Sequence, residues 1–377
     1  MNKITNCDVK LKTFVPLNVS SKFAICGLPI RMDTYKNCSF GCKYCFANCR
    51  KIMEFDKHLQ VADTKWLENK LDKVFTKKSV KPDNFLEVLM RQDLTFHCGG
   101  MSDPFQPCEE KIGATKQSID ICNKYNRTIL FSTKSDTVYD ASIRPDLHSF
   151  QLSVTGAGKD LEPNVPSIDS RKKFFDSLMK AGFKVGIRIQ PFIPGVTTLD
   201  IVREFERERE IHFTLEGLKI VPQNREHKEE VMDRLGLKKS DFLQMGLLNL
   251  KPEIRLKMYE PFIEHFEKKG ISYSIADNDM HNLGNNKCCC GDSLVKKAST
   301  FNNTSLIKKY GDEYSLSEVE AELGESGCAL CQCNSLFTSN RQEGCKTVIE
   351  FYKKRFNRES SPFSPKFIYK QDQLTLF

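Results

Sequence analysis

The sequence lacks the features that mark membrane, secreted and disordered proteins. It contains one tryptophan, and no stretch approaches the roughly 20 apolar residues that a membrane helix needs. Residues 1–14 are polar and carry no apolar signal segment. The mean hydropathy of −0.44 and the 28% of charged residues are typical of a folded, soluble chain. We therefore expect a cytoplasmic protein without a membrane segment, and its 377 residues suffice for one large core or two modest ones.

Cysteine is absent from a long central stretch, residues 123–287, although the chain has 16 cysteines. Most of them fall into two clusters, one at residues 38–49 and one at residues 288–345. In a reducing compartment, clustered thiols indicate metal ligands or redox groups before they indicate disulfides. The distribution predicts a central scaffold with one thiol site toward each end.

Glycine-rich nucleotide-binding motifs are also missing, because no Gly-x-Gly-x-x-Gly or P-loop pattern follows a predicted strand. Short apolar runs instead alternate with amphipathic segments, which predicts βαβ units, a parallel sheet and an α/β fold. About six or seven units fit, so we expect an open or closed βα barrel with function on the loops after the strands. Strands are expected at 94–98, 128–132, 150–154, 184–190, 217–221 and 271–276, and helices at 109–125, 167–181, 198–209 and 252–269.

This pattern divides the chain into three predicted regions. Residues 1–30 form an N-terminal extension, and residues 31–277 form the βα barrel. Residues 278–377 form a cysteine-rich C-terminal extension, in which only 316–323 has helical spacing.

The first cysteine cluster has the spacing Cys38-x3-Cys42-x2-Cys45. Three thiolates this close together can surround one [4Fe–4S] cluster from a single loop and leave its fourth iron open. Gly41 gives the loop the backbone freedom to wrap. The spacing leaves one alternative, a zinc knuckle in which Cys49 is the fourth ligand.

With an aromatic residue just before its third cysteine, this segment resembles the signature of radical S-adenosylmethionine enzymes. The resemblance implies a partial βα barrel of six units and two cofactors, a [4Fe–4S] cluster and S-adenosylmethionine. It also implies that reduction of the cluster splits S-adenosylmethionine into a 5′-deoxyadenosyl radical, which abstracts hydrogen from a substrate. A one-electron reductant such as a flavodoxin or ferredoxin would then be a partner.

Further segments narrow the resemblance to spore photoproduct lyase and related DNA repair enzymes. They are residues 100–107, 131–135, 161–163 and 191–195, and the similarity runs from about Tyr35 to Gly195. By this resemblance Cys38, Cys42 and Cys45 are the cluster ligands. The residues expected to contact S-adenosylmethionine are Tyr44, Gly99, Gly100, Ser102, Lys134, Ser153 and Arg188.

One position departs from the subfamily. Where the photoproduct lyases carry a cysteine that returns a hydrogen atom to the product, this sequence has Gly100. Cys98, two residues earlier in a predicted strand, is the candidate catalytic thiol, and its alternative role is that of a small buried hydrophobic residue.

The second cysteine cluster is not part of the subfamily's pattern. Because two distant groups of thiols often converge on one ion, we expect a second metal site, either structural zinc or an auxiliary iron–sulfur cluster. Its candidate ligands are Cys288, Cys289, Cys290, Cys328, Cys331, Cys333 and Cys345.

The substrate is the least determined feature. The resemblance and the net charge of +8 favour a nucleic acid, although no basic stripe interleaved with aromatic residues is present. A protein, a peptide or a small molecule are alternatives. Two non-catalytic functions also remain open, a nucleic-acid-binding zinc protein and an electron-transfer iron–sulfur protein.

Overall fold

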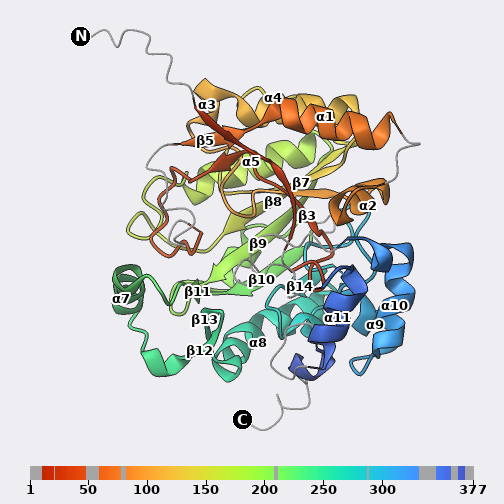
Figure 1. Cartoon of the computed structure of the whole chain (residues 1–377). Helices are drawn as coiled ribbons and strands as arrows, with labels where there is room; N and C mark the ends of the chain where they lie inside the picture. The colour runs from red at the N-terminus through yellow and green to blue at the C-terminus, as the bar shows by residue number, and fades with distance from the viewer. Residues whose placement is uncertain are drawn as a thin grey trace, which may run out of the picture.

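The computed structural model describes residues 11–20, 22–47, 59–77, 82–207, 211–286, 288–330, 345–357 and 364–369, without the side chains of Met245 and Phe367. An eight-stranded sheet crosses the centre of the molecule (Figure 1). Seven of its strands are parallel, and β2 adds an antiparallel edge. Their order is β14 (Tyr273–Ile275), β10 (Phe213–Gly217), β9 (Lys184–Phe192), β8 (His148–Val154), β7 (Ile129–Thr133), β6 (Phe96–Cys98), β3 (Ile30–Met32) and β2 (Leu17–Val19).

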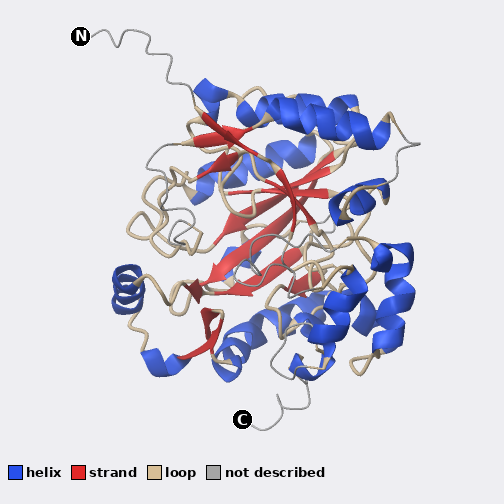
Figure 2. Ribbon diagram, viewed as in Figure 1, coloured by secondary structure: helices blue, strands red, loops and turns tan. Residues whose placement is uncertain are grey.

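Helices lie above and below this curved sheet in the view of Figure 2. They are α1 (Thr64–Phe75), α2 (Phe85–Arg91), α3 (Glu109–Ile112), α4 (Ala114–Lys124), α5 (Ile168–Lys180), α6 (Asp200–Arg203), α7 (Arg225–Arg234), α8 (Pro252–Lys269), α9 (Asn303–Tyr310), α10 (Leu316–Leu323) and α11 (Val348–Phe356). Two small sheets flank it, one of β1 (Lys12–Phe14), β5 (Gln60–Ala62) and β4 (Tyr35–Lys36), and one of β11 (Lys219–Ile220), β13 (Leu247–Leu250) and β12 (Phe242–Met245).

The predicted α/β class and parallel sheet are confirmed, and most predicted elements form. The helices expected at 167–181, 252–269 and 316–323 are α5, α8 and α10. Closure into a barrel is not observed, because β14 and β2 lie at opposite edges of the sheet in the described part of the chain. The architecture is therefore an open sheet of βα units.

Three predicted elements were wrong in extent or position. Gly113, at φ 66°, divides the helix expected at 109–125 into α3 and α4. The helix expected at 198–209 is limited to the four residues of α6 among those described. The strand expected at 217–221 is instead β10, which ends at Gly217, followed by the short β11. The sequence pattern did not predict β10, because this strand contains Glu216 and a charged residue is rare in a buried strand.

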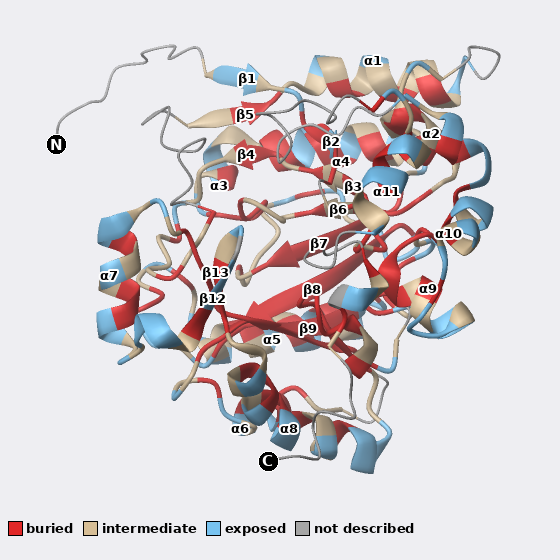
Figure 3. Cartoon of the chain, turned by 60° about the horizontal axis from the view of Figure 1, so that its bottom comes forward, coloured by how far each residue is buried: buried red, intermediate tan, exposed pale blue. Residues whose placement is uncertain are grey.

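Successive residues of each strand face opposite sides of the sheet, which separates an apolar face from a polar one. Phe131 and Phe150, adjacent in register, join the main hydrophobic core with residues of the helices. The opposite face carries polar side chains, among them Ser132 beside Gln151. Both faces are buried, as the red strands of Figure 3 show. The interior of this fold is therefore polar on one side, and that side holds the site described below.

The C-terminal region packs onto the same core. Phe351 of α11 lies 5.4 Å from Phe23, ring centroid to ring centroid, and both belong to the main core. The division of the chain at residue 277 remains a prediction, and Cys331 and Cys333 lie outside the described residues. None of the described helices is long and apolar enough to cross a membrane.

A buried histidine, His148, makes the stability of the fold depend on pH. Burial and the neighbouring Arg144 lower the pKa of His148 to about 4, against about 6.5 in an unfolded chain. Between these two pKa values the unfolded protein binds a proton that the folded protein does not bind. The free energy of unfolding therefore falls as the pH falls from about 6.5 toward 4, by up to about 1.4 kcal/mol per pH unit. We expect His148→Gln to flatten this loss, measured by urea denaturation between pH 7 and pH 4.5. Parallel curves for the two proteins would contradict the prediction.

Candidate cofactor site

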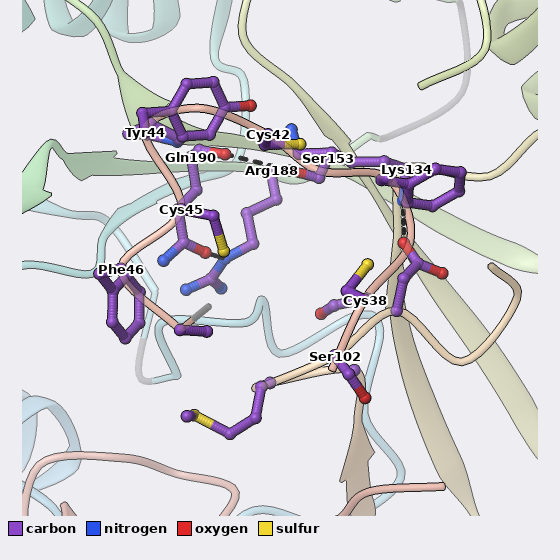
Figure 4. Close-up of a pocket in the computed structure, with 18 of the residues that line it drawn as sticks. Cys38, Cys42, Tyr44, Cys45, Phe46, Ser102, Lys134, Ser153, Arg188 and Gln190 are labelled. Carbon is purple, nitrogen blue, oxygen red and sulfur yellow. Dashed lines mark hydrogen bonds between the residues drawn. The ribbon is translucent and has the colours of Figure 1, made fainter. Parts of the chain in front are cut away.

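A cavity lies where the loops after the central strands meet (Figure 4). The cysteine loop follows β3, and other walls come from the ends of β6, β7, β8, β9 and β10. Its lining includes all the residues that the sequence assigned to the first cluster and to the cofactor: Cys38, Cys42, Tyr44, Cys45, Gly99, Gly100, Ser102, Lys134, Ser153 and Arg188. Residues spread over 150 positions of the chain are thus brought to one site.

The cysteine loop is fixed by hydrogen bonds to its backbone from both sides. Gln106 accepts from the Ser39 amide at 2.8 Å, and its own amide donates to the Asn37 carbonyl at 3.0 Å. On the other side, Asn164 donates to the Ser39 carbonyl at 3.0 Å and the Lys43 amide donates to Leu161 at 2.9 Å. These backbone contacts hold the loop so that its three cysteines line the cavity.

The three thiols fit an iron–sulfur cluster. Burial raises the pKa of Cys42 to about 12, although Lys134 opposes this, and it raises the pKa of Cys38 as well. Such partly buried, soft donors are ligands that iron would deprotonate. Among the described residues no three His, Cys, Asp or Glu side chains are grouped to hold a single ion. The ligands of a [4Fe–4S] cluster bind different irons, so they lie farther apart than those of one ion. Cys49, the fourth ligand of the zinc alternative, lies outside the described residues.

The two glycines after β6 have different roles. Gly99 has φ +98°, and a Cβ there would lie 2.1 Å from the carbonyl oxygen of Ser132. No other residue fits without moving β7. At Gly100 the nearest atoms to such a Cβ belong to the Arg31 guanidinium, at 3.8 Å, which is ordinary contact. Gly99 therefore permits the close approach of backbones, whereas Gly100 leaves space in the cavity.

Asp103 and Ser102 hold the loop after β6 in place. Asp103 accepts from the Thr133 hydroxyl at 2.7 Å and from the Lys134 amide at 2.7 Å, which binds this loop to the end of β7. Ser102 donates its hydroxyl to the Tyr35 carbonyl at 2.6 Å. Asp103 also accepts from the Phe105 amide at 3.0 Å, which caps the turn that follows β6.

Lys134 and Tyr44 converge on Glu162. The Lys134 ammonium lies 3.0 Å from a Glu162 oxygen, and the Tyr44 hydroxyl donates to the same atom. Burial alone would raise the pKa of Glu162, but Lys134 and Arg171 more than offset it, so the pKa is lowered. Lys134 is thus a largely buried cation in the same cavity as the cysteine loop.

Arg188 is held by a second buried carboxylate. Its guanidinium lies 2.5 Å from Glu216 and donates to the Gln190 side chain. Glu216 also pairs with Lys219, and these two cations more than offset its burial, which lowers its pKa to about 2. Ser153 donates to the Gln190 carbonyl at 3.2 Å. The end of β9 therefore presents an oriented cation to the cavity.

Cys98 lies on the other face of the sheet. Its thiol is fully buried in the main core, in register with Phe131, and it does not line the cavity. This position matches the alternative role of a small buried hydrophobic residue and gives a catalytic role no support.

The candidate ligands of the second metal site are divided. Cys288, Cys289 and Cys290 form a buried cluster with Cys26, which the sequence did not single out. Cys345 belongs to the main core, and Cys328 is exposed. A second metal site remains a prediction.

Glu162, Glu216 and Gln151 are site residues that sequence reasoning missed. Glu162 lies in a segment that supported the family resemblance, but it received no role. Glu216 and Gln151 each take part in an alternation of polar and apolar residues, at 213–216 and 148–154. This alternation was the available signal, because polar side chains on one face of a buried strand need partners.

Comparisons with known proteins point to one fold. No protein-family model matches the chain. An uncharacterized protein of Methanocaldococcus jannaschii is 22% identical over 201 residues, which cover 52% of this chain and 71% of that protein. Spore photoproduct lyase complexed with dinucleoside spore photoproduct matches with a TM-score of 0.55 and 15% identity, over 71% of this chain and 82% of the lyase. A mutant of that lyase with bound AdoMet and the same dinucleoside matches with a TM-score of 0.53 and 14% identity, over 70% and 82%.

These matches confirm the likeness to spore photoproduct lyase at the level of the fold. They cover more than two thirds of the chain, which extends beyond the roughly half in which the sequence resemblance was found. At this identity the matches establish the fold, and the chemistry has to be inferred from the residues of the site.

The two glycines provide a matched pair of variants. Gly99→Ala introduces a contact of 2.1 Å and a strained φ, so we expect it to lower the free energy of unfolding by at least about 2 kcal/mol. Gly100→Ala meets nothing closer than 3.8 Å and should change it by no more than about 0.5 kcal/mol. Urea denaturation at pH 7 measures both. An equal loss in the two variants would show that the approach of Gly99 to β7 is not needed.

Proposed function

We propose that this protein is a radical S-adenosylmethionine enzyme whose [4Fe–4S] cluster is held by Cys38, Cys42 and Cys45. The observation that carries the proposal is the meeting of this cysteine loop with Gly99, Lys134 and the strand ends in one cavity. When bound, the cluster supplies the electron that splits the sulfonium of S-adenosylmethionine. The fold shared with spore photoproduct lyase, which has been solved with AdoMet, supports the assignment.

The chain's own residues bind and orient the cofactor in this proposal. Lys134 offers an ammonium to the methionine carboxylate, a charge-assisted contact, while Glu162 fixes its position. Gly100, which has no side chain, would leave its backbone open to the methionine amino group, and Gly99 lines the same cavity. Tyr44 would pack beside the cluster, and Arg188 and Ser153 line the same cavity.

The largely buried ion pairs fix the charges at the cavity. Lys134 is 13% exposed and Arg188 10%, and each is paired with a carboxylate that is less than a tenth exposed. Charges held in this way do not reorganise during reaction.

We further propose that the substrate is a nucleic acid or a nucleotide-like molecule. A structural neighbour was solved with dinucleoside spore photoproduct, and this chain carries a net charge of +8. Gly100 argues against simple repair of spore photoproduct, so another radical modification is favoured. A protein, peptide or small-molecule substrate is the second candidate, and a flavodoxin or ferredoxin is the proposed class of reductant.

The chemistry is tested without knowledge of the substrate. Anaerobically reconstituted protein should be brown, and with reductant and S-adenosylmethionine it should release 5′-deoxyadenosine, measured by chromatography. Replacing Cys38, Cys42 and Cys45 with alanine should reduce this product at least 100-fold, because the ligands are lost. The matched control is Cys122→Ala, a buried thiol in the core away from the cavity. An intact, reduced cluster that forms no 5′-deoxyadenosine would contradict the proposal and favour an electron-transfer protein. A colourless protein that holds zinc would favour a zinc protein.

Salt dependence tests the class of substrate. If phosphate contacts drive binding, the affinity for a labelled DNA oligonucleotide should fall at least tenfold between 50 and 200 mM salt, with the slope reporting the number of contacts. DNA and RNA should also accelerate 5′-deoxyadenosine formation more than protein or metabolite fractions of a cell extract. Acceleration by a protein or metabolite fraction alone would overturn the nucleic-acid proposal and leave the radical chemistry standing.

A further inference from the structure

Polar side chains form a row across the polar side of the central sheet, and we call it the polar row. Each strand from β6 to β10 contributes one residue, and each residue has a partner on the next strand. His97 bonds to Ser132 at 2.8 Å, and Ser132 donates to Gln151 at 3.3 Å. Arg188 donates to Gln151 at 3.4 Å and pairs with Glu216 at 2.5 Å. The polar row therefore satisfies its own polar groups over these five strands.

Arg31 extends the polar row by one strand but is not bonded to it. It lies in β3, in register with His97 of β6, so the two side chains share one face of the sheet. Its guanidinium forms no hydrogen bond and no ion pair with any residue that the structure describes. Asp33 interacts with Arg31 only at longer range and accepts instead from the Met101 amide at 3.3 Å. A partly buried guanidinium without an anion is the arrangement expected of an anion-binding site.

Arg31 lines a second cavity, which adjoins the cofactor cavity. The charged and imidazole side chains of its lining are those of Lys22, Arg31, His97, Arg188, Glu216 and His281. The two cavities share Gly99, Gly100 and Arg188. A Cβ at Gly100 would lie 3.8 Å from the Arg31 guanidinium, so Arg31 lies beside the boundary of the two spaces. A group held at Arg31 is therefore adjacent to the cofactor cavity.

The lining of the second cavity has an excess of positive charge. Three cations and one carboxylate leave a net charge of +2 when both imidazoles are neutral. Burial, together with Arg188 and Arg31, lowers the pKa of His97 to about 3. Burial, assisted by Lys22, lowers the pKa of His281 to about 4. Both imidazoles are therefore neutral near pH 7, and the excess charge favours an anion in the cavity.

His281 adds a second polar group that lacks a partner. The side chain is 4% exposed, and its Nδ1 has no hydrogen-bond partner within the described part of the chain. A buried polar atom without a partner is costly. A polar ligand in the cavity that His281 lines would supply this partner.

We propose that the second cavity binds a phosphate monoester of the substrate, with Arg31 as the main ligand. The planar guanidinium donates to two phosphate oxygens at once, which a single ammonium cannot do. A phosphate monoester carries a charge of about −1.5 to −2 at pH 7, which matches the excess of cations in the lining. A carboxylate carries one charge and would leave part of this excess unmatched. The inference rests on the proposed function and deepens it, because it names the group that holds a nucleotide-like substrate beside the cofactor.

Binding to the holoenzyme without reductant tests the inference apart from turnover. Calorimetric titration at pH 7 compares each of the four deoxynucleoside 5′-monophosphates with the nucleoside that lacks the phosphate. At least one nucleotide should bind about tenfold or more tightly than its nucleoside. Arg31→Gln should remove this preference, and Arg31→Lys, which keeps the charge without the fork, should retain part of it. Arg203→Gln, which removes an exposed arginine outside both cavities, is the matched control for net charge.

Stability separates lost binding from lost folding. Because Arg31 has no partner in the described chain, Arg31→Gln should unfold at the same urea concentration as the unchanged protein when no anion is present. Inorganic phosphate should raise this midpoint in the unchanged protein and in Arg203→Gln, because a ligand that binds only the folded state stabilises it. The same phosphate should leave the midpoint of Arg31→Gln unchanged.

A phosphate monoester occurs on a free nucleotide and at the end of a nucleic-acid strand. An oligonucleotide with and without a 5′-phosphate distinguishes these sources. A preference for the phosphorylated strand assigns the site to strand ends, and a preference limited to mononucleotides assigns it to free nucleotides. Either preference supports the inference.

Three results would overturn the inference. They are equal affinities within all four pairs of nucleotide and nucleoside, an undiminished preference in Arg31→Gln, and tighter binding of succinate than of inorganic phosphate. All three leave the formation of 5′-deoxyadenosine untouched, so they do not count against the proposed function. Absence of 5′-deoxyadenosine from protein with a reduced cluster overturns the proposed function, and the assignment of the phosphate to a substrate falls with it.

Discussion

One buried carboxylate, that of Glu162, ties together segments that form the candidate cofactor cavity. It accepts hydrogen bonds from Tyr44 of the cysteine loop, from Lys134 after β7, from Thr155 after β8 and from Arg171 of α5. The Glu162 carboxylate is 2% exposed, and burying such a charge is costly unless it is paired. Its two cationic and two hydroxyl partners offset this cost. The position of the cysteine loop relative to the sheet follows from this arrangement, because Tyr44 lies between two of the three cysteines.

A second buried network fixes the opposite wall. Arg188, Glu216, Lys219, Asp277 and Arg255 alternate in charge from the cavity toward α8. They connect the ends of β9, β10 and β14, where parallel strands would otherwise place unpaired polar groups near the cavity. Removal of one member would leave a buried charge without its partner, which is strongly destabilising. The two networks together hold a cavity between fixed charges of both signs.

The polar face of the sheet is completed by a segment far away in the sequence. The carbonyl groups of Cys288, Cys289 and Cys290 bind side chains of three strands, and Leu294 packs where a Cβ at Gly186 would lie 2.5 Å from it. An open sheet has no opposite wall of its own, so the C-terminal region provides one. The same segment brings Cys289 and Cys290 to a second cavity, which shares Gly99, Gly100 and Arg188 with the cavity of the cysteine loop.

The sequence by itself determined the α/β class, the parallel sheet, and α5, α8 and α10, and it singled out ten of the residues that line the candidate cofactor cavity. These follow from local signals: periodicity, helix caps, and motifs whose residues are close together in the chain. The tertiary structure alone decided that Glu162 and Glu216 are the partners of Lys134 and Arg188, and that Cys26 lies with Cys288–Cys290. It also placed Cys98 on the helix-covered face, because the face of a strand depends on register with its neighbours. Partners of buried charges and thiols come from distant segments, and no local pattern records which segments the sheet will bring together.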